Sequence, residues 1–135
     1  MDFFEWNDIY SVGVKQFDDE HKRLIDYINR LHQGITTGDS KTAIISVLGG
    51  LIDYTVNHFS HEEQLLRAKG YPDLVVHKDE HDDLFIRVNE YRSNLTKGYD
   101  SFSPELMFFL KDWLTEHIQR TDKAYGVFLN EKGVR

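Results

Sequence analysis

Hydrophobic residues recur along four stretches of this chain at steps of three and four positions, which is the spacing of one face of an α-helix. Glycine and proline interrupt this pattern in three strings, ITTGDS, KGYPD and GYDSFSP. The pattern therefore predicts helices at about 18–36, 40–69, 73–97 and 104–124. Because short connections favour antiparallel neighbours, we expect an all-α, antiparallel, up-down-up-down four-helix bundle.

Capping residues indicate where two of the predicted helices begin, and the segment before the first helix has its own composition. Ser40 is a good N-cap for the second predicted helix, and Ser103 with Pro104 supplies a cap followed by proline at the first helical position of the fourth. Residues 1–16 are rich in aromatic side chains, which predicts an N-terminal aromatic arm lying over the bundle. A length of 135 residues suits a single domain over 1–135.

The composition narrows the classes of function. Cysteine is absent, which excludes disulfides, a thiol nucleophile, zinc fingers and thiolate-bound iron–sulfur clusters. The net charge is −7 without a basic stripe, so neither nucleic acid nor an anionic membrane surface is an expected partner. The sequence has no apolar run of about 18 residues, and MDFFEWNDIY carries acidic residues where a secretory signal has positive charge. We therefore expect no membrane insertion and a cytoplasmic location.

Histidines and carboxylates interrupt the apolar stripes of the predicted helices. His58 and Glu62 are four residues apart, as are His77 and His81, so each pair projects from one helical face. An unpaired polar group in an apolar core is costly, and a cation provides a compensating partner. The full set of such positions is His21, His58, Glu62, His77, His81, His117 and Asp122.

The topology brings these seven residues to one end of the bundle. In an up-down-up-down bundle the starts of the first and third helices meet the ends of the second and fourth, and all seven positions lie at those ends. The helical period alone does not require this agreement. Asp122 follows His117 by five residues, which rotates it by about 140° in an ideal helix at ~100° per residue, so we expect it to reach the site from a distorted or fraying helix end.

Three nearby residues are left out of the predicted ligand set. His32 lies roughly 16 Å from His21 along the helix at ~1.5 Å per residue, and we expect His61 to be exposed. Tyr125 follows Asp122 by about one turn and can donate a hydrogen bond to the site, but we interpret it as a structural aromatic. The acidic residues around Glu80 are interpreted as a solvated helix face.

Five imidazoles and two carboxylates are more ligands than one metal ion takes. They suit two five- or six-coordinate ions, with Glu62 and Asp122 bridging and an oxygen from solvent completing the pair. Nitrogen and oxygen ligands of this kind suit iron, with zinc, copper and manganese as alternatives. When the coordination positions of both ions are counted, one remains open on the metal that holds two histidines, and a small ligand can bind there.

The strings that carry these residues resemble the hemerythrin family, in particular its single-domain bacterial members. The resemblance covers nearly the whole chain, through SVGV, DDEHKRL, HFSHEE, HKDEH and WLTEHIQRTD. It implies two iron ions, Fe²⁺ or Fe³⁺, with a bridging oxo or hydroxo group. It also implies reversible dioxygen binding rather than catalysis, with oxidase or peroxidase chemistry at most a weak side activity.

The resemblance also implies a role for each residue of the site. His21 and His58 hold the five-coordinate iron, His77, His81 and His117 hold the six-coordinate iron, and Glu62 and Asp122 bridge the two. The oxygen pocket of the family corresponds to Trp113, Leu114 and Ile118. A dry pocket is physically reasonable because water and protons promote oxidation of the iron.

Several biological roles are consistent with such a site. The chain shows no appended signalling domain, which favours oxygen transport or storage, including delivery to an oxygen-consuming enzyme, over a module that senses oxygen or iron. A di-iron oxidase or peroxidase is the enzymatic alternative, but ferritin-like oxidases have carboxylate-rich sites with few histidines. A module that uses its metal structurally is the third alternative. We expect a monomer.

Overall fold

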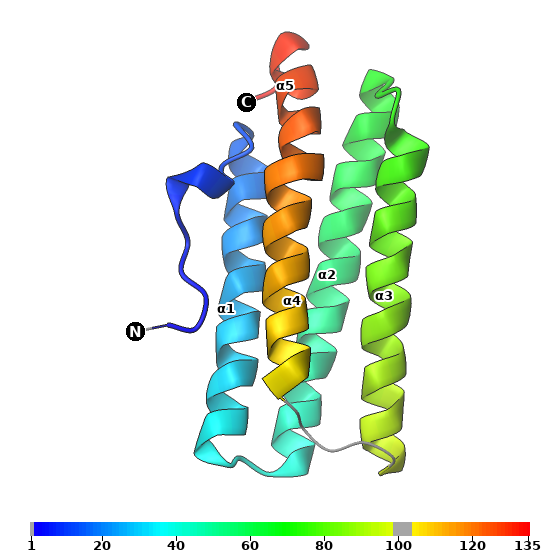
Figure 1. Ribbon diagram of the computed structural model, residues 1–135. Coiled ribbons are helices and arrows are strands. Elements are labelled where there is room, and N and C mark those ends of the chain that lie inside the picture. Colours follow the sequence, from blue (N-terminus) through cyan, green and yellow to red (C-terminus); the bar gives the residue numbers. More distant parts are fainter. Residues whose placement is uncertain (1, 99–103) are drawn as a thin grey trace.

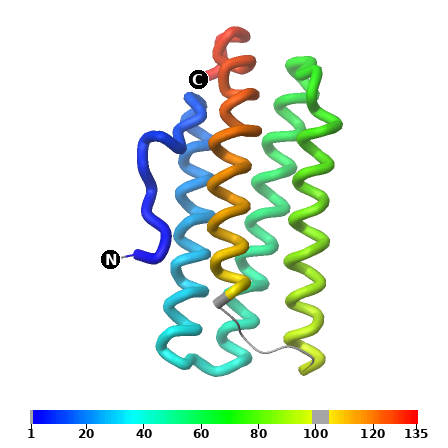
Figure 2. Tube along the Cα trace, viewed as in Figure 1, coloured from blue at the N-terminus to red at the C-terminus, as the bar shows by residue number. Residues whose placement is uncertain are grey.

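Four helical rods stand side by side in the computed structural model, which describes residues 2–98 and 104–135 (Figure 1). The first three are α1 (Lys15–Thr37), α2 (Lys41–Lys69) and α3 (Leu74–Lys97). The fourth consists of α4 (Pro104–Glu116), the π-helical turn η2 (His117–Asp122) and α5 (Lys123–Glu131). Successive rods alternate in direction, and the described residues contain no strand, which confirms the predicted all-α, antiparallel bundle (Figure 2).

Local sequence signals account for most of the helix ends. The Ser40 side chain accepts a hydrogen bond from the Ala43 N–H at 3.1 Å and caps α2. Gly38 and Gly70 end α1 and α2 with φ of 73° and 74°, a left-handed conformation that favours glycine. Pro104 begins α4, whereas the predicted cap Ser103 lies outside the described residues.

The fourth rod is longer than the predicted segment, which was expected to end at about residue 124. It continues to Glu131 because Tyr125 and Leu129 keep facing the core after η2, and neither side chain is exposed. The first rod likewise begins at Lys15 rather than at about residue 18. None of the helices that the structure describes is long and apolar enough to cross a membrane.

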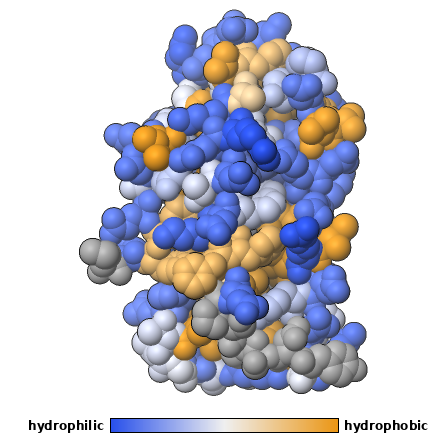
Figure 3. All heavy atoms as spheres, viewed as in Figure 1, coloured by the Kyte–Doolittle hydropathy of each residue, from blue (hydrophilic) through white to orange (hydrophobic). Residues whose placement is uncertain are grey.

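The N-terminal arm lies along the bundle beside α1 and is tied to it through its backbone (Figure 1). Asn29 makes two bonds to Phe4, accepting from its N–H and donating to its carbonyl, both at 2.8 Å. The Phe3 ring stacks on His32 with centroids 4.2 Å apart, and Lys111 donates to the Phe3 carbonyl. His32 therefore packs against the arm. The face shown in Figure 3 has many hydrophilic side chains, with a hydrophobic area across its middle.

The C-terminal part of the arm packs against the backbone of α5. An added Cβ at Gly126 would lie 2.0 Å from the Val12 carbonyl oxygen, a separation that no pair of non-bonded atoms tolerates. The Val12 N–H donates to Asp18 at 2.8 Å, and Asn130 donates to the Gly13 carbonyl at 3.0 Å. Glycine at position 126 is thus required by the close approach of the arm.

Gly126→Ala should destabilise the protein by about 1–3 kcal/mol, since the arm must shift away from α5. This loss should exceed the gain of about 1 kcal/mol that alanine normally gives over glycine within a helix. Urea denaturation of the metal-free protein measures the difference. Gly34→Ala is the matched control, because its Cβ would meet side chains rather than backbone: the end of Asp39 at 3.2 Å and Ile44 at an ordinary 3.7 Å. Equal stabilisation by both substitutions would contradict this account.

Candidate metal centre

The seven predicted ligands lie together inside one end of the bundle. Four helical segments supply them: α1, α2 and α3, and the π turn η2. Within the described part of the chain, the buried histidine and charged side chains are these seven, none more than 3% exposed: His21, His58, Glu62, His77, His81, His117 and Asp122. The predicted set and the observed buried set therefore coincide.

The ligand atoms of these side chains form two overlapping groups. One group consists of His21, His58 and Glu62, and its ligand atoms all lie within 4.8 Å of one another. The other meets the same limit and consists of Glu62, His77, His81, His117 and Asp122. Glu62 belongs to both groups, and the Asp122 carboxylate also approaches His21 at 3.1 Å. Both carboxylates thus lie between a pair and a trio of histidines.

The π turn accounts for the position of Asp122. A π-helix closes i→i+5 rather than i→i+4 hydrogen bonds, so residues five apart come close to the same face. Here η2 begins at His117 and ends at Asp122, and their side chains approach at 3.0 Å between Nε2 and Oδ1. The expected distortion is therefore a widened turn within a continuing rod, not a frayed end.

Burial and charge act in opposite directions on the histidines. Burial alone lowers the pKa of His21, but contacts with Asp122 and Glu62 outweigh it and raise that pKa to about 10. The same balance raises the pKa of His77 to about 9. Burial likewise acts to raise the pKa of Glu62, yet the surrounding histidines hold it well below its usual range. Without metal, the nearby carboxylates therefore favour the protonated form of His21 and His77.

Several buried atoms of the cluster lie close to an opposite charge but make no hydrogen bond within the described residues. They are both ring nitrogens of His21 and His77, Nδ1 of His117, Oε1 of Glu62 and both carboxylate oxygens of Asp122. Native proteins rarely leave buried polar atoms unsatisfied. In addition, Nε2 of His81 lies 3.1 Å from Nε2 of His117. Two ring nitrogens this close are suitably placed to bind the same metal ion through their lone pairs.

The chemistry of the donors shows which ions fit. Imidazole nitrogens and carboxylate oxygens without a thiolate suit first-row transition metals, including iron. The carboxylates bring two negative charges into a site that is closed to solvent, so cations are favoured and anions are not. The residues present therefore fit a pair of metal ions of the type that the sequence predicts.

Tyr125 contacts the centre directly. Its hydroxyl donates to Oε2 of Glu62, and its ring packs against Phe17 and His77, with centroids 5.5 and 5.4 Å away. Burial and then the Glu62 charge raise the pKa of Tyr125 well above its usual value, so the hydroxyl keeps its proton. Tyr125 is therefore more than the structural aromatic that the sequence predicts, and its position one turn after Asp122 is the sequence signal for this contact.

Tyr125→Phe should destabilise the metal-free protein by about 1.5–3 kcal/mol, the usual range for a hydrogen bond to a charged group. The substitution keeps the ring and its packing but removes the donor to Glu62. Chemical denaturation provides the measurement, with Tyr54→Phe as control at a tyrosine whose ring packs on Tyr27 instead. A change no larger than that of the control would mean that the bond contributes nothing.

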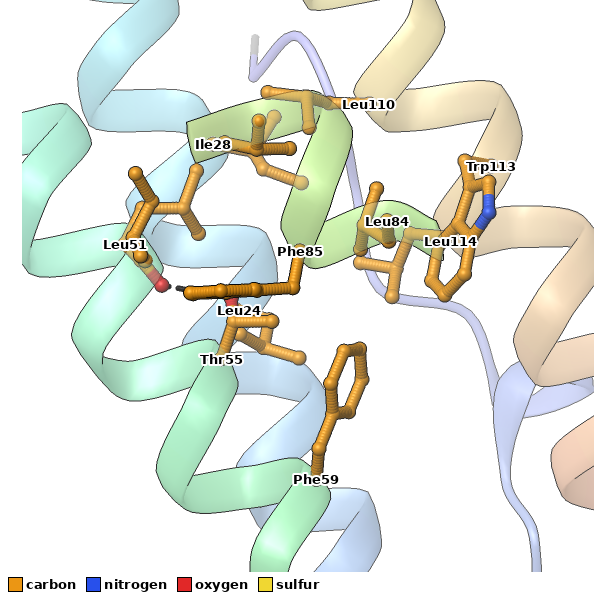
Figure 4. A pocket seen from close by; sticks show the side chains of 12 residues that line it. Leu24, Ile28, Leu51, Thr55, Phe59, Leu84, Phe85, Leu110, Trp113 and Leu114 are labelled. Carbon is orange, nitrogen blue, oxygen red and sulfur yellow. Dashed lines mark hydrogen bonds between the residues drawn. The ribbon is translucent and has the colours of Figure 1, made fainter. Parts of the chain in front are cut away.

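An apolar cavity of about 30 Å³ lies inside the bundle, and two of its wall residues, Phe59 and Trp113, contact histidines of the trio (Figure 4). Trp113 and Leu114 line it, and the Trp113 ring stacks on His117 with centroids 4.4 Å apart. Thr55 is the polar residue in its wall, but its hydroxyl donates to the Leu51 carbonyl at 2.7 Å. A cavity with satisfied polar groups excludes ordered water and accepts small apolar molecules.

The third residue of the predicted oxygen pocket has a different position. Ile118 is fully buried immediately after His117 but is not among the residues that line this cavity. Phe59 lines it instead, and its ring stacks on His81 at 3.6 Å between centroids. Two aromatic rings therefore separate the cavity from two of the histidines.

Comparisons with known proteins identify relatives along nearly the whole chain. The family model described as Hemerythrin HHE cation binding domain matches residues 12–129. The chain is 37% identical over 126 residues to a bacteriohemerythrin of Stenotrophomonas maltophilia (strain R551-3), covering 93% of this chain and 81% of that protein. It is 38% identical over 121 residues to a bacteriohemerythrin of Methylococcus capsulatus (strain Bath), with coverage of 90% and 92%.

More distant relatives and solved structures give the same result. Myohemerythrin-1 of Phascolopsis gouldii is 30% identical over 122 residues, covering 90% of this chain and 91% of that protein. A crystal structure of wild-type hemerythrin superposes with a TM-score of 0.88 at 35% identity, covering 92% of this chain and 95% of that chain. The likeness therefore extends to both sequence and fold.

Proposed function

The chain belongs to the hemerythrin family, and on that premise we propose that it binds dioxygen reversibly at a non-heme centre of two iron ions. The observation that supports this most directly is the closed cluster of five histidines and two carboxylates with several unpaired buried atoms. A site built for catalysis with bulky substrates needs an opening, whereas dioxygen requires only a small dry space such as the cavity beside Trp113.

The proposed ligand assignment follows the two groups of side chains. His21 and His58 would hold one iron, and His77, His81 and His117 would hold the other. Glu62 and Asp122 would be the ligands shared by both ions, and solvent would supply the bridging oxo or hydroxo group. When bound, the iron pair supplies an open coordination position for dioxygen and the electrons for its reversible reduction.

The protein's own residues maintain the conditions for reversibility. Trp113, Leu114 and Phe59 keep water from the cavity side of the histidines, since water and protons promote irreversible oxidation. Tyr125 holds Glu62 in place through its hydroxyl, and Ile118, which follows His117 in sequence, is fully buried. These contacts support binding without turnover.

We further propose that the protein carries or stores dioxygen in the cytoplasm, as a monomer, for an oxygen-consuming enzyme. The acidic net charge of −7 predicts that such a partner presents a basic surface. Oxidase or peroxidase activity, if measurable, should be slow relative to oxygen release, because the site is rich in histidine rather than in carboxylates.

Anaerobic loading with ferrous iron tests the function. Visible absorption spectra are recorded before oxygen, after oxygen, and after its removal under vacuum. We expect about two irons per chain and a visible band that appears with oxygen and disappears without it, over repeated cycles. A band that never forms, or one that decays irreversibly with release of peroxide, would favour a structural metal site or an oxidase instead.

A further inference from the structure

Two carboxylates outside the ligand set contact the outer nitrogens of the histidines. We propose that Glu20 and Glu63 are positioning residues of the metal centre, each orienting one histidine ligand and strengthening its bond to the metal. This inference rests on the proposed function, because it concerns the same centre. Glu20 and Glu63 both lie outside the set of seven ligands.

Glu20 reaches from α1 to a histidine of α2. Its Oε1 lies 2.6 Å from Nδ1 of His58, while Nε2 of the same ring points inward to Glu62 at 3.3 Å. The Glu20 side chain is only 14% exposed. Its other oxygen lies 2.9 Å from Nδ1 of His61, a half-exposed histidine, so both carboxylate oxygens are held in place.

Glu63 makes the equivalent contact one helix further along. It reaches from α2 to α3, where its Oε2 lies 2.8 Å from Nδ1 of His81. Nε2 of His81 points inward, 3.3 Å from Glu62. The Glu63 side chain is 16% exposed. The bond is therefore partly shielded from water, where a charged hydrogen bond is stronger than at the surface.

The two contacts follow one structural rule. Glu20 precedes the ligand His21 in sequence, and Glu63 follows the ligand Glu62. Neighbouring residues on a helix point about 100° apart. The ligands His21 and Glu62 therefore face the centre of the bundle. Their neighbours Glu20 and Glu63 face the adjacent helix and contact its histidine.

The contacts are selective among the five histidines. Nδ1 of His21 and Nδ1 of His77 have no hydrogen-bond partner among the described residues. Glu80 lies 3.9 Å from Nδ1 of His117, too far for a hydrogen bond, and accepts from Thr121 instead. Each proposed iron site therefore receives one histidine anchored by a carboxylate, His58 in the pair and His81 in the trio.

The geometry determines what the carboxylates do chemically. When Nδ1–H donates to a carboxylate, the proton is fixed on Nδ1 and the lone pair of Nε2 faces the metal. The negative charge also makes the imidazole a stronger electron donor, which favours the ferric over the ferrous state. Loss of such partners in other metal sites weakens metal affinity by about 10–100-fold.

The test compares Glu20→Gln and Glu63→Gln with Asp19→Asn. Asp19 is adjacent to Glu20 and loses the same charge, but it is 53% exposed and pairs with Lys15. Ferrous affinity is measured anaerobically by competition with a chelator, and the reduction potential by redox titration. Glutamine retains an acceptor for Nδ1–H but removes the charge, whereas Glu20→Ala and Glu63→Ala remove both.

We expect affinity to fall about 10–100-fold in the alanine variants and less in the glutamine variants, with a higher reduction potential in both and no change in Asp19→Asn. Variants that change only thermal stability, with affinity and potential equal to those of Asp19→Asn, would overturn the positioning role. Failure of the unaltered protein to bind two irons would instead contradict the proposed function, so the two failures are distinguishable.

Discussion

His77→Ala should reduce iron binding from two ions per chain to one or fewer and abolish the oxygen-dependent visible band. His77 is 1% exposed and contacts both carboxylates, with Nε2 3.2 Å from Asp122 and 3.8 Å from Glu62. Its loss removes one metal-binding nitrogen from the histidine trio and one neighbouring imidazole from each of the two carboxylates. Metal analysis after anaerobic loading and desalting gives the stoichiometry.

The control for this substitution is His32→Ala. His32 belongs to the same residue type but stacks on Phe3 of the arm, away from the centre. Helical content measured by circular dichroism establishes that both variants are folded. We expect His32→Ala to bind two irons and to respond to oxygen, and retention of both irons by folded His77→Ala would refute the ligand assignment.

Iron loading should release at least two protons per chain near neutral pH. Because the pKa of His21 is raised to about 10 and that of His77 to about 9 in the metal-free cluster, both imidazoles carry protons that iron must displace. Each displaced proton makes the apparent affinity rise about tenfold per pH unit, so two protons give about 100-fold. Calorimetry in buffers of different ionisation enthalpy counts the protons released.

The stability of the metal-free protein should depend on pH in the opposite direction to its iron affinity, because the same two histidines are involved. A histidine whose pKa is raised on folding contributes stability below its unfolded value of about 6.5, and this contribution is lost as pH rises through the folded value. Stability without metal should therefore fall between about pH 6.5 and pH 10, whereas iron affinity rises over the lower part of that range. Equal trends with and without iron would show that protons and metal do not compete for these rings.

The sequence predicts the bundle and the ligand set for one shared physical reason. Four-residue spacing places His58 with Glu62 and His77 with His81 on single helical faces, and short connections determine which helix ends meet. Burial then predicts the metal, because a cluster of polar side chains in an apolar core requires a compensating partner such as a cation. In the structure, these four side chains are no more than 1% exposed.

Asp122 shows where helical periodicity alone fails. An ideal helix turns it away from His117, and only the resemblance to a family made it a secure ligand prediction. The structure resolves this through the π turn from His117 to Asp122, a local widening that the residue types of HIQRTD do not encode by propensity. The rod continues past this turn to Glu131 because Tyr125 and Leu129 are buried in the core.

Contacts between the site and its surroundings were the least predictable part. Acidic residues such as Glu20 and Glu63 are most often solvated, and only their position opposite a histidine of the next helix distinguishes them. Tyr125 was similarly ambiguous, because a buried aromatic packs in the same way with or without a hydrogen bond. These roles depend on distances across helices, which a single sequence does not contain.

Anomalous diffraction at the iron edge, from crystals of the iron-loaded protein, tests the central claim most directly. The account predicts two iron peaks per chain at this end of the bundle, one near His21 and His58 and one near His77, His81 and His117. Glu62 and Asp122 should lie between the peaks. A single peak, or iron bound by other side chains, would contradict the assignment of these seven residues as the ligands of a di-iron centre.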